Sequence, residues 1–478
     1  MNKMSISLTG MASGLNTAEM VEKLMALERK SYEKLENKQT YMNDVKSFYT
    51  GINTKLSALR NAASDLMLRA NYQLTSAKSS NESVAQVSAG TSVSTGSFLV
   101  EVSQLATPHV MMWDTATPDT DFAGGEITKT IKFHFEGKEI EIEAKGKNAG
   151  ELMESIKTQV NSNAKGLTAA VINTSTGKKL IFNASNSGSD GKIGFTSAEK
   201  GVYIEDSEGA FSLLGTNTQI APEEAIFKVN GVEITQGSNV ITNVIDGVTM
   251  NLTGKGSSTV KVSTDTDKIT SKVEAFIKAY NDITTSIRDV IGEKKPLQGD
   301  STLRDLSNQM NQWMNTLVDF GDGTDFDKKY TISSFGLEID KGQTKASLMT
   351  GTISFDKEKF INKFLEDPEL VISMFNKTVP DLNNPDNPDK LPKAVGIAAL
   401  FKDNVYAWSK SDGVFASKIK GYDAEVALIT DQMSRLDAKL QAKEARMKSQ
   451  FTAMEVALSK LQSEQTYMSS QLNALTKK

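Results

Sequence analysis

The sequence predicts an α+β multidomain protein in which both ends of the chain form an antiparallel helical bundle or coiled coil, with β-rich outer domains inserted between them. Three observations lead to this fold class. Residues 422–478 contain neither Pro nor Gly, and a large apolar residue recurs there at every seventh position. A second apolar stripe with helical spacing runs from residue 17 to 66. Between them, from residue 71, the pattern changes to alternating strand-like segments rich in Ser, Thr and Val.

The C-terminal stripe predicts one long amphipathic helix with a coiled-coil-like seam. At about 1.5 Å per residue, a helix of about 54 residues would reach roughly 80 Å, so its apolar side needs a partner along much of its length. The seven-residue row is Met433, Leu440, Met447, Met454, Leu461, Met468 and Leu475.

The N-terminal stripe is the expected partner of that helix. Asn16 followed by Glu19 is a capping-box signature, which places the helix start near Thr17. The apolar positions that follow are Met20, Val21, Leu24, Leu27, Leu35, Met42, Val45, Tyr49, Ile52, Leu56, Leu59 and Leu66.

The C-terminal seam changes sides between residues 440 and 450. Each row residue has a companion on the same side of the helix. Leu436 lies three residues after Met433, whereas Phe451 lies four residues after Met447. Between them, the polar Lys443 occupies the companion position after Leu440. We therefore expect packing within the chain before this point and contacts with other subunits after it. The alternative is a coiled coil that only joins the chain ends. The expected assembly contacts are Leu24, Leu27, Leu35, Met42, Met447, Phe451, Met454, Leu458, Leu461, Met468, Leu472 and Leu475.

Four domains follow from these changes of pattern. A terminal coiled-coil leg combines 1–42 with 437–478, and a helical-bundle domain with a small hairpin combines 43–74 with 266–436. A β-rich domain combines 75–112 with 221–265, and its strands are expected to share one sheet. Residues 113–220 form an inserted α/β outer domain, in which two strands, a helix at 150–161 and two more strands give a β-β-α-β-β unit.

Within the bundle domain, helices are expected at 266–291 and 303–317, and two short helices are expected on either side of Pro368. Four of the nine prolines lie in 380–392, which predicts an extended loop. The long C-terminal helix is expected to begin near Ala394, with bends near Gly413 and Gly421.

Composition excludes several classes of function. The chain has no Cys and only two His, at 109 and 134, so thiolate chemistry and a His-based metal site or triad are not expected. The net charge of −5 argues against nucleic acid as a partner, and no apolar run is long enough to cross a membrane. The acidic run from Asp319 to Asp327 does not match an EF-hand loop. The first 14 residues lack the apolar core of a signal peptide. No enzyme activity, metal or cofactor is predicted.

Several segments resemble the bacterial flagellar filament cap family, the filament-capping hook-associated proteins. They occur in the family's order along the chain, with a gap at 113–220. They are Leu8 to Thr17, Met20 to Met25, Phe98 to Ala106, Pro296 to Arg304, Gly351 to Asp356, and Arg446 to Glu455 leading into Tyr467 to Leu472.

This resemblance implies a structural protein of bacterial motility. Members of the family form a homo-oligomeric ring at the distal tip of the flagellum, where coiled-coil legs reach into the filament and flagellin folds and inserts beneath a plate of β domains. The implied partners are other copies of the chain, flagellin and the filament tip, an export chaperone and the flagellar type III export apparatus. The implied location is extracellular, after export without a cleaved signal peptide. Two alternatives remain: another axial component, such as a flagellin or hook–filament junction protein, and a surface adhesin that binds through its outer β domains.

Overall fold

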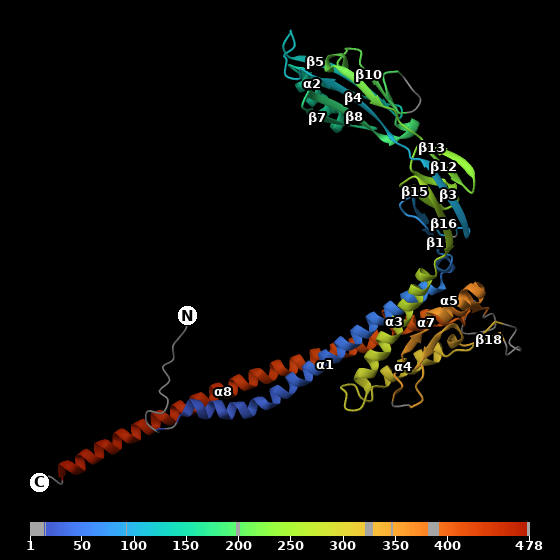
Figure 1. Cartoon of the computed structure of the whole chain (residues 1–478). Coiled ribbons are helices and arrows are strands. Elements are labelled where there is room, and N and C mark those ends of the chain that lie inside the picture. Colours follow the sequence, from blue (N-terminus) through green and yellow to red (C-terminus); the bar gives the residue numbers. More distant parts are fainter. Residues whose placement is uncertain are drawn as a thin grey trace. The chain divides into compact units, whose positions relative to one another are not determined.

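The structure is a computed structural model that describes residues 14, 16–91, 93–196, 201–320, 328–345, 348–380 and 392–475. The chain divides into two compact units (Figure 1). One unit joins the chain ends, Met1–Leu68 with Thr270–Lys478, and the other is Arg69–Ile269. The first is mainly helical and the second mainly β-sheet. The predicted fold class, terminal helices with β-rich domains inserted between them, is confirmed.

Helix α1 (Thr17–Met67) begins where its capping box predicts. The Asn16 side-chain oxygen accepts the Glu19 N–H at 3.1 Å, and the Asn16 amide donates to the Glu19 carboxylate at 3.2 Å. From its middle onward, α1 is buried along one stripe because its apolar residues recur at spacings of three and four. The buried residues of this stripe are Val45, Tyr49, Ile52, Leu56, Leu59, Ala63 and Leu66.

The predicted bent helix from Ala394 is wrong, because the chain makes two helices there. Helix α7 (Ile397–Ser409) ends in a tight turn, and α8 (Val414–Leu475) begins just after Gly413. A Cβ atom on Gly413 would lie 2.7 Å from the Ala407 carbonyl oxygen and 2.8 Å from that of Trp408, so the turn admits only Gly. Gly421, by contrast, lies within continuous helix with open space around it.

Four further helices and three small two-stranded sheets complete the helical unit. Pro368 separates two short helices as predicted, and the Asp367 side chain caps the second by accepting the Leu370 N–H at 3.0 Å. Of the acidic run, Asp319 is described and Asp322, Asp325 and Asp327 lie outside the described residues, as do residues 381–391 of the proline-rich loop. The elements are α3 (Thr266–Ile291), α4 (Ser301–Met314), α5 (Lys357–Glu366), α6 (Pro368–Asn376), β17 (Val318–Asp319) with β18 (Lys329–Tyr330), β19 (Leu337–Ile339) with β20 (Ile353–Phe355), and β21 (Thr378–Val379) with β22 (Lys393–Ala394).

The first β domain has two sheets, where the sequence predicted one. Strand β2 pairs with β15 and not with β3, so the strands divide into a five-stranded and a three-stranded sheet around a shared core. The larger sheet is β1 (Thr75–Ser79), β16 (Gly256–Thr264), β3 (Gly96–Gln104), β12 (Ala225–Val229) and β13 (Val232–Gln236). The smaller is β14 (Val240–Ile245), β15 (Val248–Leu252) and β2 (Ala85–Ala89).

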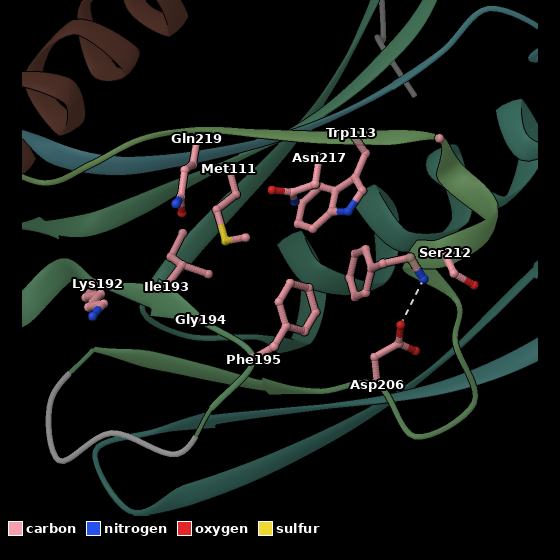
Figure 2. A pocket seen from close by; sticks show the side chains of 12 residues that line it. Met111, Trp113, Lys192, Ile193, Gly194, Phe195, Asp206, Ser212, Asn217 and Gln219 are labelled. Atoms are coloured by element: carbon pink, nitrogen blue, oxygen red, sulfur yellow. Dashed lines mark hydrogen bonds between the residues drawn. The ribbon is translucent and has the colours of Figure 1, made fainter.

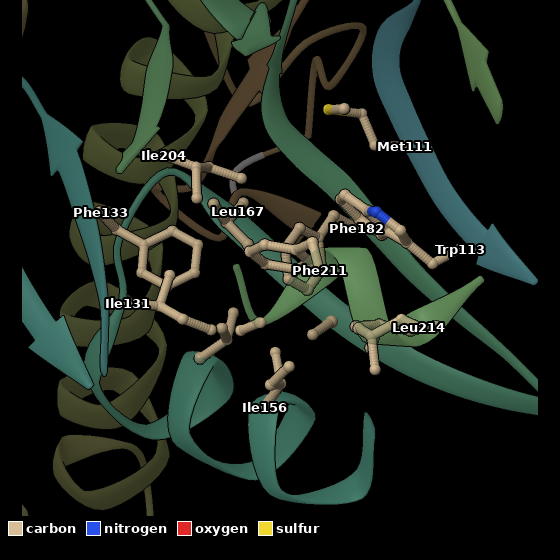
Figure 3. Close-up of a cluster of buried hydrophobic side chains, with 14 of the residues drawn as sticks. Met111, Trp113, Ile131, Phe133, Ile156, Leu167, Phe182, Ile204, Phe211 and Leu214 are labelled. Carbon is tan, nitrogen blue, oxygen red and sulfur yellow. The ribbon is translucent and has the colours of Figure 1, made fainter. Parts of the chain in front are cut away.

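The outer domain packs two four-stranded sheets and one helix around an aromatic core (Figure 3). The predicted β-β-α-β-β unit is present as β5, β6, α2, β7 and β8. Strand β4 also belongs to this domain and runs across the predicted limit at 113, because it pairs along β8. One sheet is β6 (Lys138–Gly146), β5 (Ile127–Phe135), β10 (Val202–Glu205) and β9 (Ile193–Gly194). The other is β11 (Thr216–Ile220), β4 (Pro108–Thr115), β8 (Gly177–Ser187) and β7 (Leu167–Thr174), and the helix is α2 (Ala149–Asn163).

The predicted four-domain division stays a prediction. None of the helices described here is both long and apolar enough to span a lipid bilayer.

Candidate functional site

Helices α1 and α8 run antiparallel, and charged side chains mark their register. Lys38 pairs with Glu425 at 2.9 Å, and Lys443 pairs with Glu28 at 2.8 Å. These side chains are largely exposed, and such pairs typically contribute only about 0–1 kcal/mol each. They define which turns of the two helices face each other and add little to the stability of the pair.

Aromatic packing holds the start of α8 against the middle of α1. The buried Tyr49 ring lies 5.2 Å from the Phe415 ring and 5.5 Å from the Tyr422 ring, between ring centroids. The Tyr49 hydroxyl donates a hydrogen bond of 2.7 Å to Asp300, whose other oxygen caps α4. Burial, and then the neighbouring Asp300 carboxylate, raise the pKa of Tyr49 far above its ordinary value, so the phenol stays protonated and remains the donor.

A small apolar cluster marks the far end of the α1–α8 pairing. Val21, Met25 and Leu440 are buried at its centre. The half-buried side chains around them are Tyr32, Leu436, Met447 and Phe451. Pairing within the chain therefore continues as far as Phe451.

Helix α8 continues beyond this cluster to Leu475, whereas the antiparallel helix α1 starts at Thr17, close to the cluster (Figure 1). We call residues 454–475 of α8 the overhang, which at about 1.5 Å per residue is roughly 30 Å long. The seven-residue row persists there, yet its side chains face solvent: Met454 is 37% exposed, Leu461 60% and Met468 63%. An exposed row of large apolar side chains at helical spacing is typical of a surface that contacts another protein.

The twelve predicted contact residues fall into four groups. Met447 and Phe451 belong to the cluster with α1. Leu35, Met42 and Leu458 are half-buried. Leu24, Leu27, Met454, Leu461, Met468 and Leu472 are exposed. The side chain of Leu475 lies outside the described residues. Their role as partner contacts stays a prediction.

Four residues of α1 and α8 were not among the predicted contacts: the buried Val21 and Met25 and the exposed Val456 and Tyr467. Val21 and Met25 are buried against α8, whereas the predicted Leu24 and Leu27 point away from it. Val21 and Met25 lie within one helical turn of Leu24 and Leu27, so the apolar residues at 20–27 could be assigned to either face of α1. Val456 and Tyr467, both 65% exposed, lie off the seven-residue row and had no pattern to mark them.

The outer domain contains a pocket of about 560 Å³ between its two sheets (Figure 2). Its floor is aromatic: the Trp113 and Phe211 rings stack with their centroids 4.5 Å apart, and the partly exposed Phe195 meets the Phe211 ring edge-on at 5.5 Å. Lys192, Asp206, Asn217 and Gln219 supply the polar lining.

Two of the polar groups near the pocket serve the fold. The Asp206 carboxylate accepts the backbone N–H of Ala210 at 2.7 Å and that of Phe211 at 3.0 Å, and Figure 2 shows the second of these bonds. His109 is buried; its Nδ1 accepts the Ile193 N–H at 2.8 Å, and its Nε2 lies 3.2 Å from the Gln219 side-chain oxygen. Burial first, and then the nearby Lys192 cation, lower the pKa of His109, while the hydrogen bond to Gln219 acts in the opposite direction.

Over the described part of the chain, no group of three or more His, Asp or Glu side chains is arranged to hold a metal ion.

Comparison with known proteins covers most of the chain. A family model described as the flagellar hook-associated protein 2 C-terminus matches residues 222–463, and the model of its N-terminus matches residues 13–109. A-type flagellar hook-associated protein 2 of Pseudomonas aeruginosa is 24% identical over 508 residues, and flagellar hook-associated protein 2 of Escherichia coli K12 is 22% identical over 492 residues; each alignment covers 98% of both chains.

A solved structure shares the fold. The D1–D2–D3 domains of the flagellar cap protein FliD from Escherichia coli give a TM-score of 0.54 at 20% identity, covering 79% of this chain and 99% of that chain. The C-terminal family model alone spans more than half of the sequence, and the N-terminal model matches where α1 begins. The chain thus belongs to the flagellar hook-associated protein 2 family.

Proposed function

We propose that this protein caps the distal end of the flagellar filament as a ring of identical subunits and promotes the folding and insertion of flagellin. Membership in the hook-associated protein 2 family supports a role in the flagellum and in oligomeric assembly. The role is structural: the protein holds surfaces in place at the filament tip and catalyses no covalent step.

The overhang is the observation that carries this proposal. A helix that keeps Met454, Leu461 and Met468 in water forgoes much of the stabilisation that burial gives, about 1.5–3 kcal/mol per large apolar side chain. A partner helix that covered these three side chains, which are 37–63% exposed, would recover on the order of 2–5 kcal/mol. The terminal helices of neighbouring cap subunits carry the same long apolar stripes, which such a contact needs.

Before export, the same stripe requires protection. An export chaperone that covers the overhang would prevent premature association, and its release at the type III export apparatus would free the stripe for the filament. The protein would then act outside the cell, at the distal tip, having been exported without a cleaved signal peptide.

The test is complementation of a strain that lacks this gene. The deletion strain is expected to release monomeric flagellin into the medium and to lack long filaments, and the full chain is expected to restore them. A triple variant with Met454→Asp, Leu461→Asp and Met468→Asp should be secreted but should fail to restore filaments. Immunoblotting of the medium and electron microscopy of the cells measure both properties.

The matched control places three Asp residues on the opposite face of the same helix, at Ser459, Ser463 and Ser470. It adds the same charge to the overhang and is expected to restore filaments. Normal filaments in the deletion strain would contradict the cap function itself. Full complementation by the Met454/Leu461/Met468 variant would instead contradict the role of the overhang and leave the cap function standing.

A further inference from the structure

The structure places one buried imidazole at the junction of the two outer-domain sheets. Strand β4 alternates its side chains, so His109 lies on the same inward face as Met111, Trp113 and Thr115. The latter three continue into the domain core, whereas His109 occupies the end of the strand beside β9 and β11. It is 3% exposed, which is unusual for a residue that titrates near neutral pH.

His109 holds two edge strands at once. Through Nδ1 it accepts the Ile193 N–H of β9, which belongs to the other sheet, and through Nε2 it contacts Gln219 of β11. Strand β9 has little else to hold it, because it pairs with β10 through only two residue pairs, whereas β11 is an exposed edge strand that pairs with β4 along all five of its residues. Ile193 and Gln219 also line the aromatic pocket (Figure 2), so this contact closes one end of it.

The two hydrogen bonds define the protonation state of the ring. A nitrogen that accepts an N–H must carry a lone pair, so Nδ1 is unprotonated and the single proton sits on Nε2, from which it is donated to the Gln219 oxygen. Protonating Nδ1 would set two N–H groups against each other at 2.8 Å. The imidazolium therefore cannot keep the contact with β9.

The charges around the ring add to this preference for the neutral form. Lys192, immediately before β9, repels a positive charge on the ring. On β8, the register places the neutral Asn183 and Ser187 beside the bulge that contains His109. The carboxylates of the neighbouring elements are Asp190 on the 3₁₀ turn Gly188–Gly191 and Glu223 and Glu224 after β11, and Glu224 already accepts the Ser189 N–H.

We propose that His109 is a pH-sensitive clamp: its neutral ring holds β9 against β4, and its protonation releases β9 and opens that side of the aromatic pocket lined by Trp113, Phe195 and Phe211, while the Nε2–H contact with Gln219 of β11 persists. The direction follows from linkage. The folded-state pKa is lowered below the ordinary value of about 6.5, so the opened state binds more protons than the closed state as the pH falls below that value. The closed form is fully favoured above about pH 6.5 and loses stability as the pH falls toward the folded-state pKa.

Hydrogen exchange of the full chain at pH 7 and pH 5, corrected for the intrinsic exchange rate, tests the clamp. In peptides covering 190–196, the opening equilibrium should rise from pH 7 to pH 5 by up to about 25-fold, the limit set by an open-state pKa of about 6.5. His109→Asn keeps an acceptor near the position of Nδ1 and cannot titrate, so this rise should disappear. His134→Gln removes the other His of the chain, which stacks on Tyr203 at the surface of the other sheet, and should leave the rise intact.

An equal rise in His109→Asn and the unchanged chain would overturn the proposal, as would unchanged protection of these peptides at the two pH values. Should His109→Asn fail to fold, NMR titration of the His134→Gln protein decides, because His109 is then its only imidazole. A measured pKa well below 6.5 supports the clamp, and one at or above 6.5 overturns it.

Discussion

Residues 414–451 of α8, the paired part, lie against α1 and α7, whereas the overhang continues past the residue where α1 begins. Both carry the same seven-residue apolar row. In the paired part, Met433 and Leu440 of that row are buried, and in the overhang Leu461 and Met468 are about 60% exposed. The difference comes from α1, which supplies Val21 and Met25 to the buried cluster with Leu440 and begins at Thr17.

This contrast shows that an apolar period predicts that a helix needs a partner but not where the partner is. Within one helix, the apolar row packs inside the chain up to Phe451, and its described members from Met454 to Met468 are exposed. Helix propensity alone does not hold an isolated helix of this length firmly, because such helices are marginal in water. The overhang should therefore behave differently from the paired part whenever the protein is a monomer.

The largest expected effect is in hydrogen exchange of the isolated monomer. Amides at 422–440 should exchange only through opening of the α1–α8 pairing, at a free-energy cost that approaches that of global unfolding, about 5–15 kcal/mol. Amides at 450–475 should exchange within the first minutes, because fraying of a single helix costs almost nothing. Mass spectrometry of the exchanged peptides measures both segments in the same sample.

Two outcomes would distinguish contact of 450–475 with another molecule from packing within the monomer. Equal protection of 450–475 and 422–440 in the monomer would contradict the assignment of the overhang to an external partner. Protection that appears at 450–475 only when the protein assembles would confirm that other subunits cover it.

The next effect is on stability. Leu56→Ala removes a fully buried side chain of α1 and should lower the free energy of unfolding of the helical unit by about 2–5 kcal/mol. Met468→Ala removes an apolar side chain of similar size from the overhang and should change it by less than about 0.5 kcal/mol. Urea denaturation followed by circular dichroism measures both. A loss of more than about 1 kcal/mol in Met468→Ala would show that the overhang is already packed within the monomer.

Local signals predicted the parts of the fold that depend on neighbours in the sequence. Asn16 and Glu19 gave the start of α1, and Pro368 gave the break between α5 and α6, because capping and the missing proline N–H act within one turn. Strand pairing was harder. The alternation at 84–105 identified strands but could not show that β2 would pair with β15 while β3 joined the other sheet.

Some features of the candidate site were likewise visible in the sequence, and others were not. The row from Met433 to Met468 was visible in the sequence, and so was the seam change near residue 440. The residue at which the pairing ends was not, because it depends on how far α1 reaches; the cluster with α1 includes Phe451, at the far end of the region where the seam was predicted to change sides. The aromatic pocket and the His109 contact combine β4, β9, β10 and β11, which are far apart in the sequence, so no local pattern could indicate them.

The smallest effect concerns the ion pair between Glu28 of α1 and Lys443 of α8. Lys443 and Glu28 lie at 2.8 Å, but both side chains are nearly half exposed, so water and salt screen their attraction. A double-mutant cycle with Glu28→Ala, Lys443→Ala and both together should give a coupling of about 0–1 kcal/mol in low salt and almost none in 1 M salt. Lys443 occupies the place where the apolar seam changes sides, so this pair replaces an apolar contact that the helices lack at that turn. A coupling of 2 kcal/mol or more that persisted in high salt would mean that the pair is desolvated. In that case the α1–α8 pairing would be tighter at this turn than the exposed side chains indicate, and the transition to the overhang would be sharper.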